Sequence, residues 1–266
     1  MPTFDANGVT IAYDDNNPLG AERTAVLIHG FSSNRIEGWR RTGWYAALER
    51  RHHRMIAIDL RGHGESQKFY DPADYTREKM AGDVVALLDH LGVARADVFG
   101  FSMGSRVAVE VALMAPDRVS NLILGGVGEK MIAPKSEDAP RYSMSDAMLA
   151  EDVDAIPDPM ARAFRQFAEE QGEDLKAIAA VGKAPNTPLD LEGMSRLPMP
   201  VLVMAGDRDH LAGDPEGLAR AFPDGHGVVL NGCDHFSAIP HASAKATYFD
   251  FIDGMLDDPF PNPFAR

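Results

Sequence analysis

A serine between two glycines is the first candidate for chemistry in this sequence. Ser102 lies in GFSMG at positions 100–104, after the apolar run ADVF and before the helix-like segment RVAVEVALMA. Gly-x-Ser-x-Gly between a buried strand and a helix is typical of a nucleophile elbow, a tight turn that exposes the hydroxyl at the end of a sheet. Gly100 and Gly104 leave room for neighbouring backbone. We therefore predict that Ser102 is a nucleophile rather than a simple helix cap.

The serine needs a histidine, because a hydroxyl is a poor nucleophile at neutral pH without a general base. Nine histidines are present, and His235 follows the last predicted strand, in NGCDHFS. A loop at the end of the sheet is the position from which an imidazole reaches a nucleophile elbow. His29 in HGF and His63 in DLRGHGES are interpreted as residues that shape loops. His235 is therefore the predicted base.

The base needs an acid to orient it, and the tetrahedral oxyanion needs backbone N–H donors. Asp207 and Asp209 both follow the predicted strand VLVMAG, and Glu129, after LILGG, is a more distant candidate. One oxyanion donor in an elbow is the amide after the serine, here Met103. The second is predicted at Phe31, in the loop HGFSSN that follows an earlier strand.

These residues need a sheet that brings distant segments together. Strands are predicted at 25–29, 55–59, 97–101, 119–126, 201–206 and 227–232. Helices are predicted at 43–51, 80–91, after Ser102 and near 246–256, and Asn7-Gly8 predicts a tight hairpin close to the N-terminus. The alternation of strand and helix predicts an α/β fold with a mostly parallel sheet that is covered on both faces.

The alternation is interrupted between residues 128 and 197. This stretch is rich in Asp, Glu, Met and Pro and shows helical periodicity without strands. It predicts a helical insertion into a core formed by residues 1–127 and 198–266. The tail 257–266 cannot continue the last helix past Pro259 and is expected along the surface.

Composition excludes several classes of partner. The formal charge of −14, from 40 acidic and 26 basic residues, argues against nucleic acid or an anionic membrane as the main partner. The short basic cluster RRHHR at 50–54 is interpreted as a solvated helix end. A single cysteine, Cys233, allows no intrachain disulfide, and neither a signal peptide nor an apolar run of membrane-spanning length is evident. A cytoplasmic protein is the expectation, with monomer and homodimer both open.

The motifs together resemble the α/β-hydrolase superfamily. They are HGF at 29–31, DLRGHGES at 59–66, GFSMG at 100–104, and GDRD with GCDH near the end, in an order that covers nearly the whole chain. The resemblance implies an α/β-hydrolase fold in which residues 128–197 form a helical cap. It also implies Ser102 as nucleophile and His235 as base, and it selects Asp209 over Asp207 as the acid, since the family acid usually stands three residues after the strand-end glycine.

The type of nucleophile limits which branches of the superfamily are expected. A serine makes the haloalkane dehalogenase and epoxide hydrolase branches unexpected, and the loop after His29 lacks the glycine-rich run of the carbon–carbon bond hydrolases. We expect a serine hydrolase that cleaves small to medium apolar carboxylic esters, with no metal or organic cofactor. A lactonase, a cofactor-free perhydrolase or haloperoxidase-like enzyme, and a ligand-binding receptor with a retained triad remain alternatives.

Apolar residues of the insertion are candidates for the wall of a substrate pocket, although most are expected to pack helices together. They are Met131, Ile132, Met144, Met148, Leu149, Met160, Phe164 and Phe167.

Overall fold

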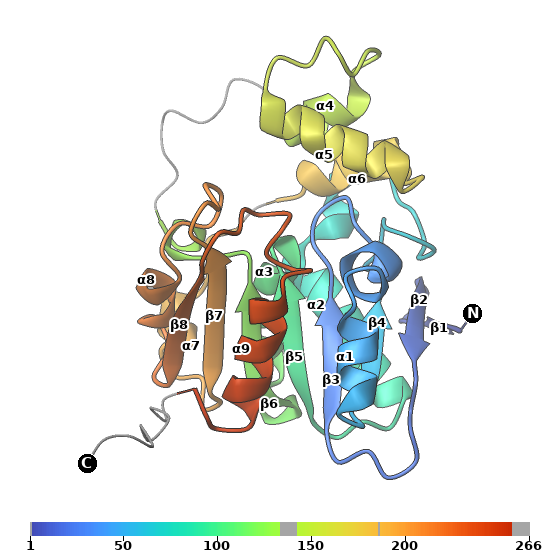
Figure 1. Ribbon diagram of the computed structural model, residues 1–266. Coiled ribbons are helices and arrows are strands. Elements are labelled where there is room, and N and C mark those ends of the chain that lie inside the picture. The colour runs from blue at the N-terminus through green and yellow to red at the C-terminus, as the bar shows by residue number, and fades with distance from the viewer. Residues whose placement is uncertain (1, 134–142, 186, 257–266) are drawn as a thin grey trace.

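The centre of the protein is a single twisted sheet of eight strands (Figure 1). The structure is a computed structural model that describes residues 2–133, 143–185 and 187–256. The strand order is β1-β2-β4-β3-β5-β6-β7-β8. The pairs β1–β2 and β2–β4 are antiparallel, and every other neighbouring pair is parallel. The predicted α/β fold with a mostly parallel sheet is therefore confirmed.

The predicted strands and helices are each observed within a few residues of their predicted bounds, and the helix Pro215–Ala219 has no predicted counterpart. The strands are β1 (Thr3–Asp5), β2 (Thr10–Asp15), β3 (Thr24–Ile28), β4 (Arg54–Ile58), β5 (Ala96–Phe101), β6 (Val119–Gly125), β7 (Val201–Gly206) and β8 (Gly225–Leu230). The helices of the core are α1 (Trp44–Arg50), α2 (Arg77–His90), α3 (Met103–Met114), α7 (Leu191–Met194), α8 (Pro215–Ala219) and α9 (Ala242–Ile252). The predicted hairpin is confirmed, because Asn7 and Gly8 take positive φ angles of 56° and 89° between β1 and β2.

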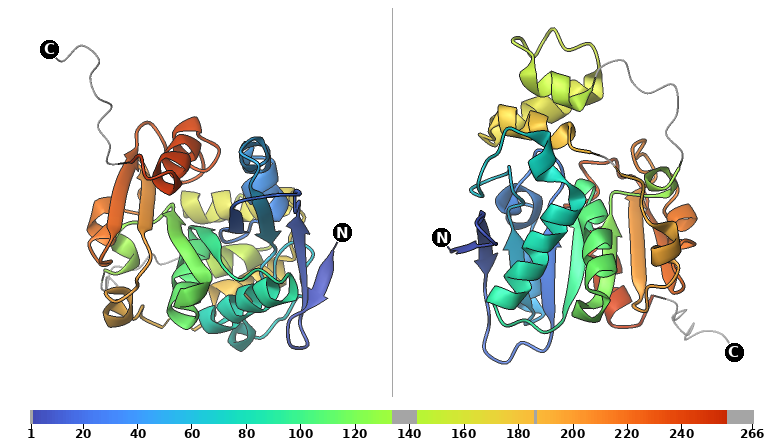
Figure 2. Two further views of the ribbon diagram at one scale, coloured as in Figure 1. Left: turned by 90° about the horizontal axis from the view of Figure 1, so that it is seen from below. Right: turned by 180° about the vertical axis from the view of Figure 1, so that it is seen from behind.

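Helices cover both faces of the sheet because successive strand residues point to opposite sides. Val26 and Ile28 of β3 belong to the same buried cluster as the inner faces of α2 and α3. Ala25 and Leu27 belong to the other cluster, which contains residues of α1 and α9. Figure 1 views the face covered by α1 and α9, and the right panel of Figure 2 views the face covered by α2 and α3.

Three helices lie above the carboxyl ends of the strands (Figure 1). They are α4 (Met144–Leu149), α5 (Pro159–Glu170) and α6 (Leu175–Gly182). Their own buried cluster includes Met148 and Phe164 and packs against Phe31 of the core. Within the described residues, the interval 128–197 contains no strand, but Met131 and Met194 near its ends belong to the main core cluster. The division into a core and a cap at 128 and 197 stays a prediction.

A buried carboxylate ties these helices to the core. Glu173, in the turn between α5 and α6, accepts hydrogen bonds from Asn34 Nδ2 (2.8 Å) and from the amide of Gly64 (2.9 Å). Burial raises the pKa of the Glu173 carboxyl above its ordinary value, although both hydrogen bonds oppose the shift. The three upper helices are thus anchored directly over the loops that follow β3 and β4.

Two further predictions concern the C-terminal tail and membrane-spanning helices. The predicted course of the tail, 257–266, lies outside the described residues. In the part of the chain that the structure describes, no helix combines the length and the apolar character that crossing a bilayer requires.

Candidate active site

Ser102 stands at a strained turn between β5 and α3. Its φ and ψ angles are 55° and −113°, a conformation that costs energy for a residue with a side chain. The turn is held by the Ser102 amide, which donates to Gly125 O at 2.8 Å, and by the hydroxyl of Ser105, which donates to Gly100 O at 2.8 Å. A Cβ at Gly100 would collide with the backbone of Gly104, and this packing explains the glycines around the serine. The sequence pattern and the geometry both describe a nucleophile elbow.

The structure brings together the three residues predicted to form a catalytic triad. The Ser102 Oγ lies 3.0 Å from Nε2 of His235, and Nδ1 of His235 lies 2.7 Å from Oδ2 of Asp209. His235 and Asp209 are both buried. When Nδ1 carries the proton and donates a hydrogen bond to the carboxylate, Nε2 is unprotonated and can accept the serine proton.

Asp209 rather than Asp207 reaches the imidazole. The second oxygen of Asp209 accepts from the amides of Leu211 and Ala212, at 2.9 and 3.1 Å, so the carboxylate is fixed by its own loop. Asp207 is exposed and accepts from the amide of Gly232 at 2.8 Å, which ties the loop after β7 to the loop that carries His235. Asp207 therefore stabilises the loop through a backbone hydrogen bond rather than orienting the imidazole.

Glu129, the third candidate acid, lies elsewhere. Its side chain packs beside Gly213 and Gly217, at the start of α8, and no hydrogen bond within the described residues joins it to His235. Of the three candidate acids, only Asp209 is therefore hydrogen-bonded to His235.

The two residues predicted to supply oxyanion amides, Met103 and Phe31, line the same cavity as Ser102. Met103 begins α3, so its amide belongs to the first turn, where helix N–H groups have no partner within the helix. Phe31 follows Gly30, whose ideal Cβ position lies 3.4 Å from the Cβ of Ser102. Neither amide donates a hydrogen bond to another described residue. Both amides therefore remain available to a developing negative charge near Ser102.

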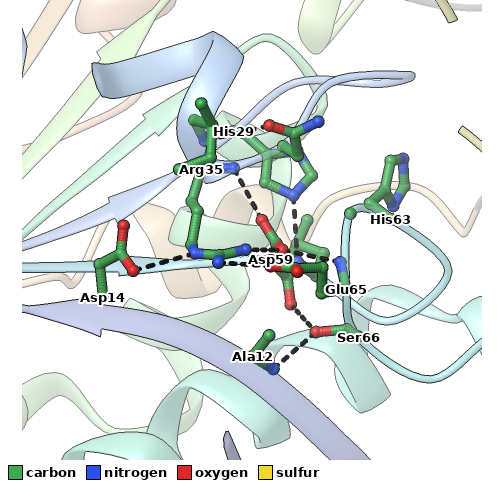
Figure 3. Close-up of polar contacts among 12 residues, drawn as sticks. Ala12, Asp14, His29, Arg35, Asp59, His63, Glu65 and Ser66 are labelled. Carbon is green, nitrogen blue, oxygen red and sulfur yellow. Dashed lines mark hydrogen bonds and ion pairs between the residues drawn. The ribbon is translucent and has the colours of Figure 1, made fainter. Parts of the chain in front are cut away.

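A buried ionic network fixes the loop that carries Phe31 (Figure 3). Asp59, at the end of β4, is fully buried, and its carboxylate accepts from the amide of Arg35 at 2.7 Å and also pairs with the Arg35 guanidinium. The guanidinium contacts Asp14 and Glu65 as well. Burial would lower the pKa of Arg35, but the charges of Asp59 and Asp14 outweigh burial and raise it.

Two buried histidines complete the support of this loop. Nε2 of His29 accepts from the amide of Leu60 at 3.0 Å, and its Nδ1 donates to Gly30 O at 2.8 Å. The ring of His63 stands edge-on to His29, with centroids 4.9 Å apart. Burial lowers the pKa of both imidazoles, and for His63 the neighbouring His29 adds to the effect. Both histidines hold loops in place, the role that the sequence predicted for them.

Two cavities meet at Ser102. The first, of about 300 Å³, includes Ser102, Met103, Met131, Arg77 and Arg106 in its wall. The second, of about 240 Å³, is bounded by a set of aromatic rings and also reaches Ser102 and His235. The rings are Phe31, Trp39, Phe101, Phe164, Phe167 and Phe236. We call the two spaces the arginine cavity and the aromatic cavity.

The predicted pocket residues divide into distinct groups. Phe164 and Phe167 line the aromatic cavity, and Met131 lines the arginine cavity. The ring of Phe164 lies beside His235, with centroids 6.2 Å apart. The others pack the cap or the core or are exposed, as expected for most of the set: Ile132, Met144, Met148, Leu149 and Met160.

Sequence reasoning missed the two arginines and the network around Asp59. Arg77 and Arg106 lie on different helices, and the sequence contains no local signal that they face one cavity. The pairing of Arg35 with Asp59 had a weak signal, because a charged residue directly after an apolar strand is expected to find a partner if it is buried.

Comparison with known proteins agrees with this fold. Residues 25–180 match the family described as the alpha/beta hydrolase fold, and the chain belongs to that family. It is 30% identical over 241 residues to the 2-hydroxymuconate semialdehyde hydrolase of Pseudomonas putida, and the match covers 84% of each chain. It is similar in structure to the enol-lactonase from Burkholderia xenovorans LB400, with a TM-score of 0.77 and 26% identity over 95% of this chain and 100% of that one.

A further relative is much longer than this chain. The dihydrolipoyllysine-residue acetyltransferase component of the acetoin cleaving system of Pseudomonas putida is 32% identical over 223 residues. The match covers 79% of this chain but only 58% of that protein. The predicted resemblance to the α/β-hydrolases is confirmed by the family match, and the hydrolase of Pseudomonas putida and the enol-lactonase named above support a hydrolase as the class of enzyme.

Proposed function

We propose that this protein is a serine hydrolase that cleaves carboxylic esters through an acyl-enzyme. One observation carries the proposal, namely the unbroken chain of hydrogen bonds from Asp209 through His235 to Ser102. A hydroxyl, an imidazole and a carboxylate in this order supply a nucleophile, its base and the group that fixes the tautomer of the base.

The geometry supports a specific sequence of steps. His235 Nε2 takes the proton of Ser102 as Oγ attacks the ester carbonyl, and the amides of Phe31 and Met103 donate to the oxyanion. The C–O bond to the alcohol then breaks, and the imidazolium gives its proton to the leaving oxygen. Water, deprotonated by His235, attacks the acyl carbonyl carbon. The second oxyanion then collapses, the bond from that carbon to Ser102 Oγ breaks, and the imidazolium returns its proton to Oγ as the acid is released. Asp209 holds the imidazole and stabilises its cationic form.

The comparisons support ester chemistry without naming a substrate. An enol-lactone is a cyclic ester, so the structural neighbour acts on the bond that this proposal assigns. The aromatic cavity suits a small to medium apolar group on one side of the ester. We therefore propose a small-molecule ester as the partner of this site.

A panel of p-nitrophenyl esters and lactones, measured with the wild type and the Ser102→Ala variant, tests the proposal. We expect turnover of several esters by the wild type and none above background by the variant. Ser105→Ala is an informative companion, because Ser105 is buried and holds the turn without facing the site. Equal turnover by wild type and Ser102→Ala would refute the assignment of the nucleophile.

Two further measurements separate the proposal from its alternatives. Bromination that depends on peroxide would indicate a perhydrolase, and an adduct that persists on Ser102 without turnover would indicate a receptor. Because one relative is a 2-hydroxymuconate semialdehyde hydrolase, that compound belongs in the panel as a test of carbon–carbon bond cleavage. Each of these outcomes with no ester turnover would contradict the proposal.

A further inference from the structure

The arginine cavity is unusual in its charge. Two arginines, Arg77 and Arg106, are among its lining residues, and no Asp or Glu is among its described lining residues. The chain as a whole carries a formal charge of −14, so a cavity with this sign opposes the general character of the protein. This local positive charge next to Ser102 is suited to bind an anion.

Among the described residues, Arg106 has few partners for its guanidinium. It follows Ser102 by one turn of α3, and its single hydrogen bond among the described residues runs from Nη1 to Met131 O at 3.3 Å. No carboxylate of the described chain lies within ion-pair distance of it. Burial, with a smaller contribution from Arg77, lowers the pKa of its guanidinium. A half-buried cation without a counter-ion is costly, and an anionic ligand would relieve that cost.

Arg77 is only partly satisfied. Its Nη2 donates to Thr187 Oγ1 at 2.9 Å and to Pro188 O at 3.3 Å, and its Nε lies 3.7 Å from Oε2 of Glu110. Nε and Nη1 are buried without a hydrogen-bond partner in the described part of the chain. Glu110 pairs with Arg77 but is not among the lining residues of the cavity. Because Nε and Nη1 are shielded from solvent, Arg77 contributes positive charge beside the cavity, whereas Arg106 is the lining cation with no carboxylate partner among the described residues.

We propose that the arginine cavity binds a carboxylate of the substrate, so that the enzyme prefers esters that carry a second, free carboxyl group. This inference rests on the proposed function, because it names the substrate class of the same site. Arg77 has Glu110 and Glu78 as acidic neighbours. Arg106, by contrast, has no carboxylate partner among the described residues. About one positive charge is thus uncompensated, which matches a carboxylate better than a phosphate monoester at about −1.5 to −2. The planar guanidinium also presents paired donors that fit a carboxylate.

The two cavities then divide the substrate between them. Both include Ser102 and His235 in their walls, so an ester carbonyl at Ser102 can direct one substituent into each space. The free carboxylate occupies the arginine cavity, and the apolar substituent occupies the aromatic cavity. A carboxylate held away from the reacting bond binds the substrate and the transition state equally, so its effect belongs in KM rather than in kcat.

The test compares esters that differ in one charge. The first pair is p-nitrophenyl hydrogen adipate and its neutral methyl ester, which place the carboxylate on the acyl side. The second pair is the hexanoate of p-nitrophenol and the hexanoate of a nitrophenol that carries a carboxyl group on its ring, which place it on the alcohol side. We expect the wild type to prefer the acidic member of at least one pair in kcat/KM.

Arg106→Gln removes the charge and retains a donor for Met131 O. We expect it to lower kcat/KM for the preferred acidic ester about 10- to 100-fold through KM, and to leave the neutral partner within about twofold. Arg106→Lys should restore part of the preference because it keeps the positive charge. Arg220→Gln is the matched control, because Arg220 is exposed directly after α8 and pairs with Glu216 at the surface.

The outcomes keep this inference separate from the proposed function. If no ester in the set is cleaved, the proposed function fails. If neutral esters are cleaved but neither acidic ester is preferred, or if Arg106→Gln leaves the preference unchanged, the inference about the carboxylate is overturned while the hydrolase stands. An equal loss for acidic and neutral esters in Arg106→Gln would assign Arg106 a structural role and would also overturn it.

Discussion

The arginine cavity and the aromatic cavity share a nucleophile but differ in how they are built. The charged side chains of the first lie on α2 and α3, helices packed directly on the sheet. The second takes Phe164 and Phe167 from α5, which lies above the sheet, and Phe236 from the loop of His235. Recognition of charge is thus assigned to the core, and recognition of apolar surface is assigned largely to the helices that cover it.

The difference follows from the range and direction of the forces. A guanidinium and a carboxylate need fixed positions to form short bonds, and helices anchored in the core supply them. Apolar contact is non-directional and tolerates small shifts of the helix that provides it. A substrate can therefore be held by its charge while the apolar cavity adapts to the other substituent. The predictions that follow either act on both cavities through what they share or act on one alone.

The largest expected effect comes from the acid that both cavities depend on. Asp209→Asn should reduce kcat by about 10⁴-fold, as the same replacement does in the triad of a serine protease, because the amide favours the wrong tautomer of His235. The loss should be equal for acidic and neutral esters. Steady-state kinetics and a melting curve measure the two consequences.

Asp207→Asn is the matched control for that experiment. Asp207 bonds the amide of Gly232 rather than the imidazole, so we expect a modest loss of stability and nearly normal kcat. A collapse of kcat in the Asp207 variant with activity retained in the Asp209 variant would reverse the assignment.

The next effect concerns the loop that carries Phe31, which forms part of both cavities. Asp59→Asn removes the buried partner of Arg35 and should lower the free energy of unfolding by about 3–5 kcal/mol, measured by urea denaturation. Asp117→Asn, at an exposed site, controls for the loss of a carboxylate. A change below about 1 kcal/mol, the range of surface ion pairs, would mean that the network does not hold the loop.

Acidification should destabilise the same loop. Because the pKa values of buried His29 and His63 are lowered in the folded protein, the unfolded chain binds more protons below its ordinary histidine pKa. The free energy of unfolding should therefore decrease as the pH is lowered from about 7.5 to about 5.5, by up to about 1.4 kcal/mol per histidine. Urea unfolding at the two pH values measures the slope.

His63→Asn should remove roughly half of the slope that these two histidines contribute. His210→Asn, at an exposed site, should leave the slope unchanged. An identical slope in the wild type and in His63→Asn would show that buried His63 does not resist protonation.

The smallest effect distinguishes the cavities from each other. Phe167→Ala removes an aromatic wall and should raise KM for the neutral hexanoate ester about tenfold, because apolar contact area is lost. The preference for a carboxylate should remain, since the arginines are untouched. Leu149→Ala, exposed on α4, is the control. If Phe167→Ala abolishes the carboxylate preference and spares apolar binding, the division between the cavities is wrong.

The parts of the site that could be predicted are those with a local signature. Ser102 is marked by glycines and by the strand and helix around it, and His235 by its place after the last strand. Asp209 needed the resemblance, because it and Asp207 share one loop and only the turn decides which carboxylate faces the imidazole. Arg77 and Arg106 could not be predicted, since their meeting depends on the packing of α2 against α3 and not on any pattern along the chain.

The central claim is that Ser102 is an activated nucleophile, and chemical labelling tests it most directly. A fluorophosphonate reacts with a serine only when a base and an oxyanion site activate it. The account predicts that the wild type gains one adduct, which peptide mass spectrometry locates on Ser102, and that His235→Gln and Ser102→Ala gain none. Labelling on another serine, or undiminished labelling of Ser102 in His235→Gln, would contradict it.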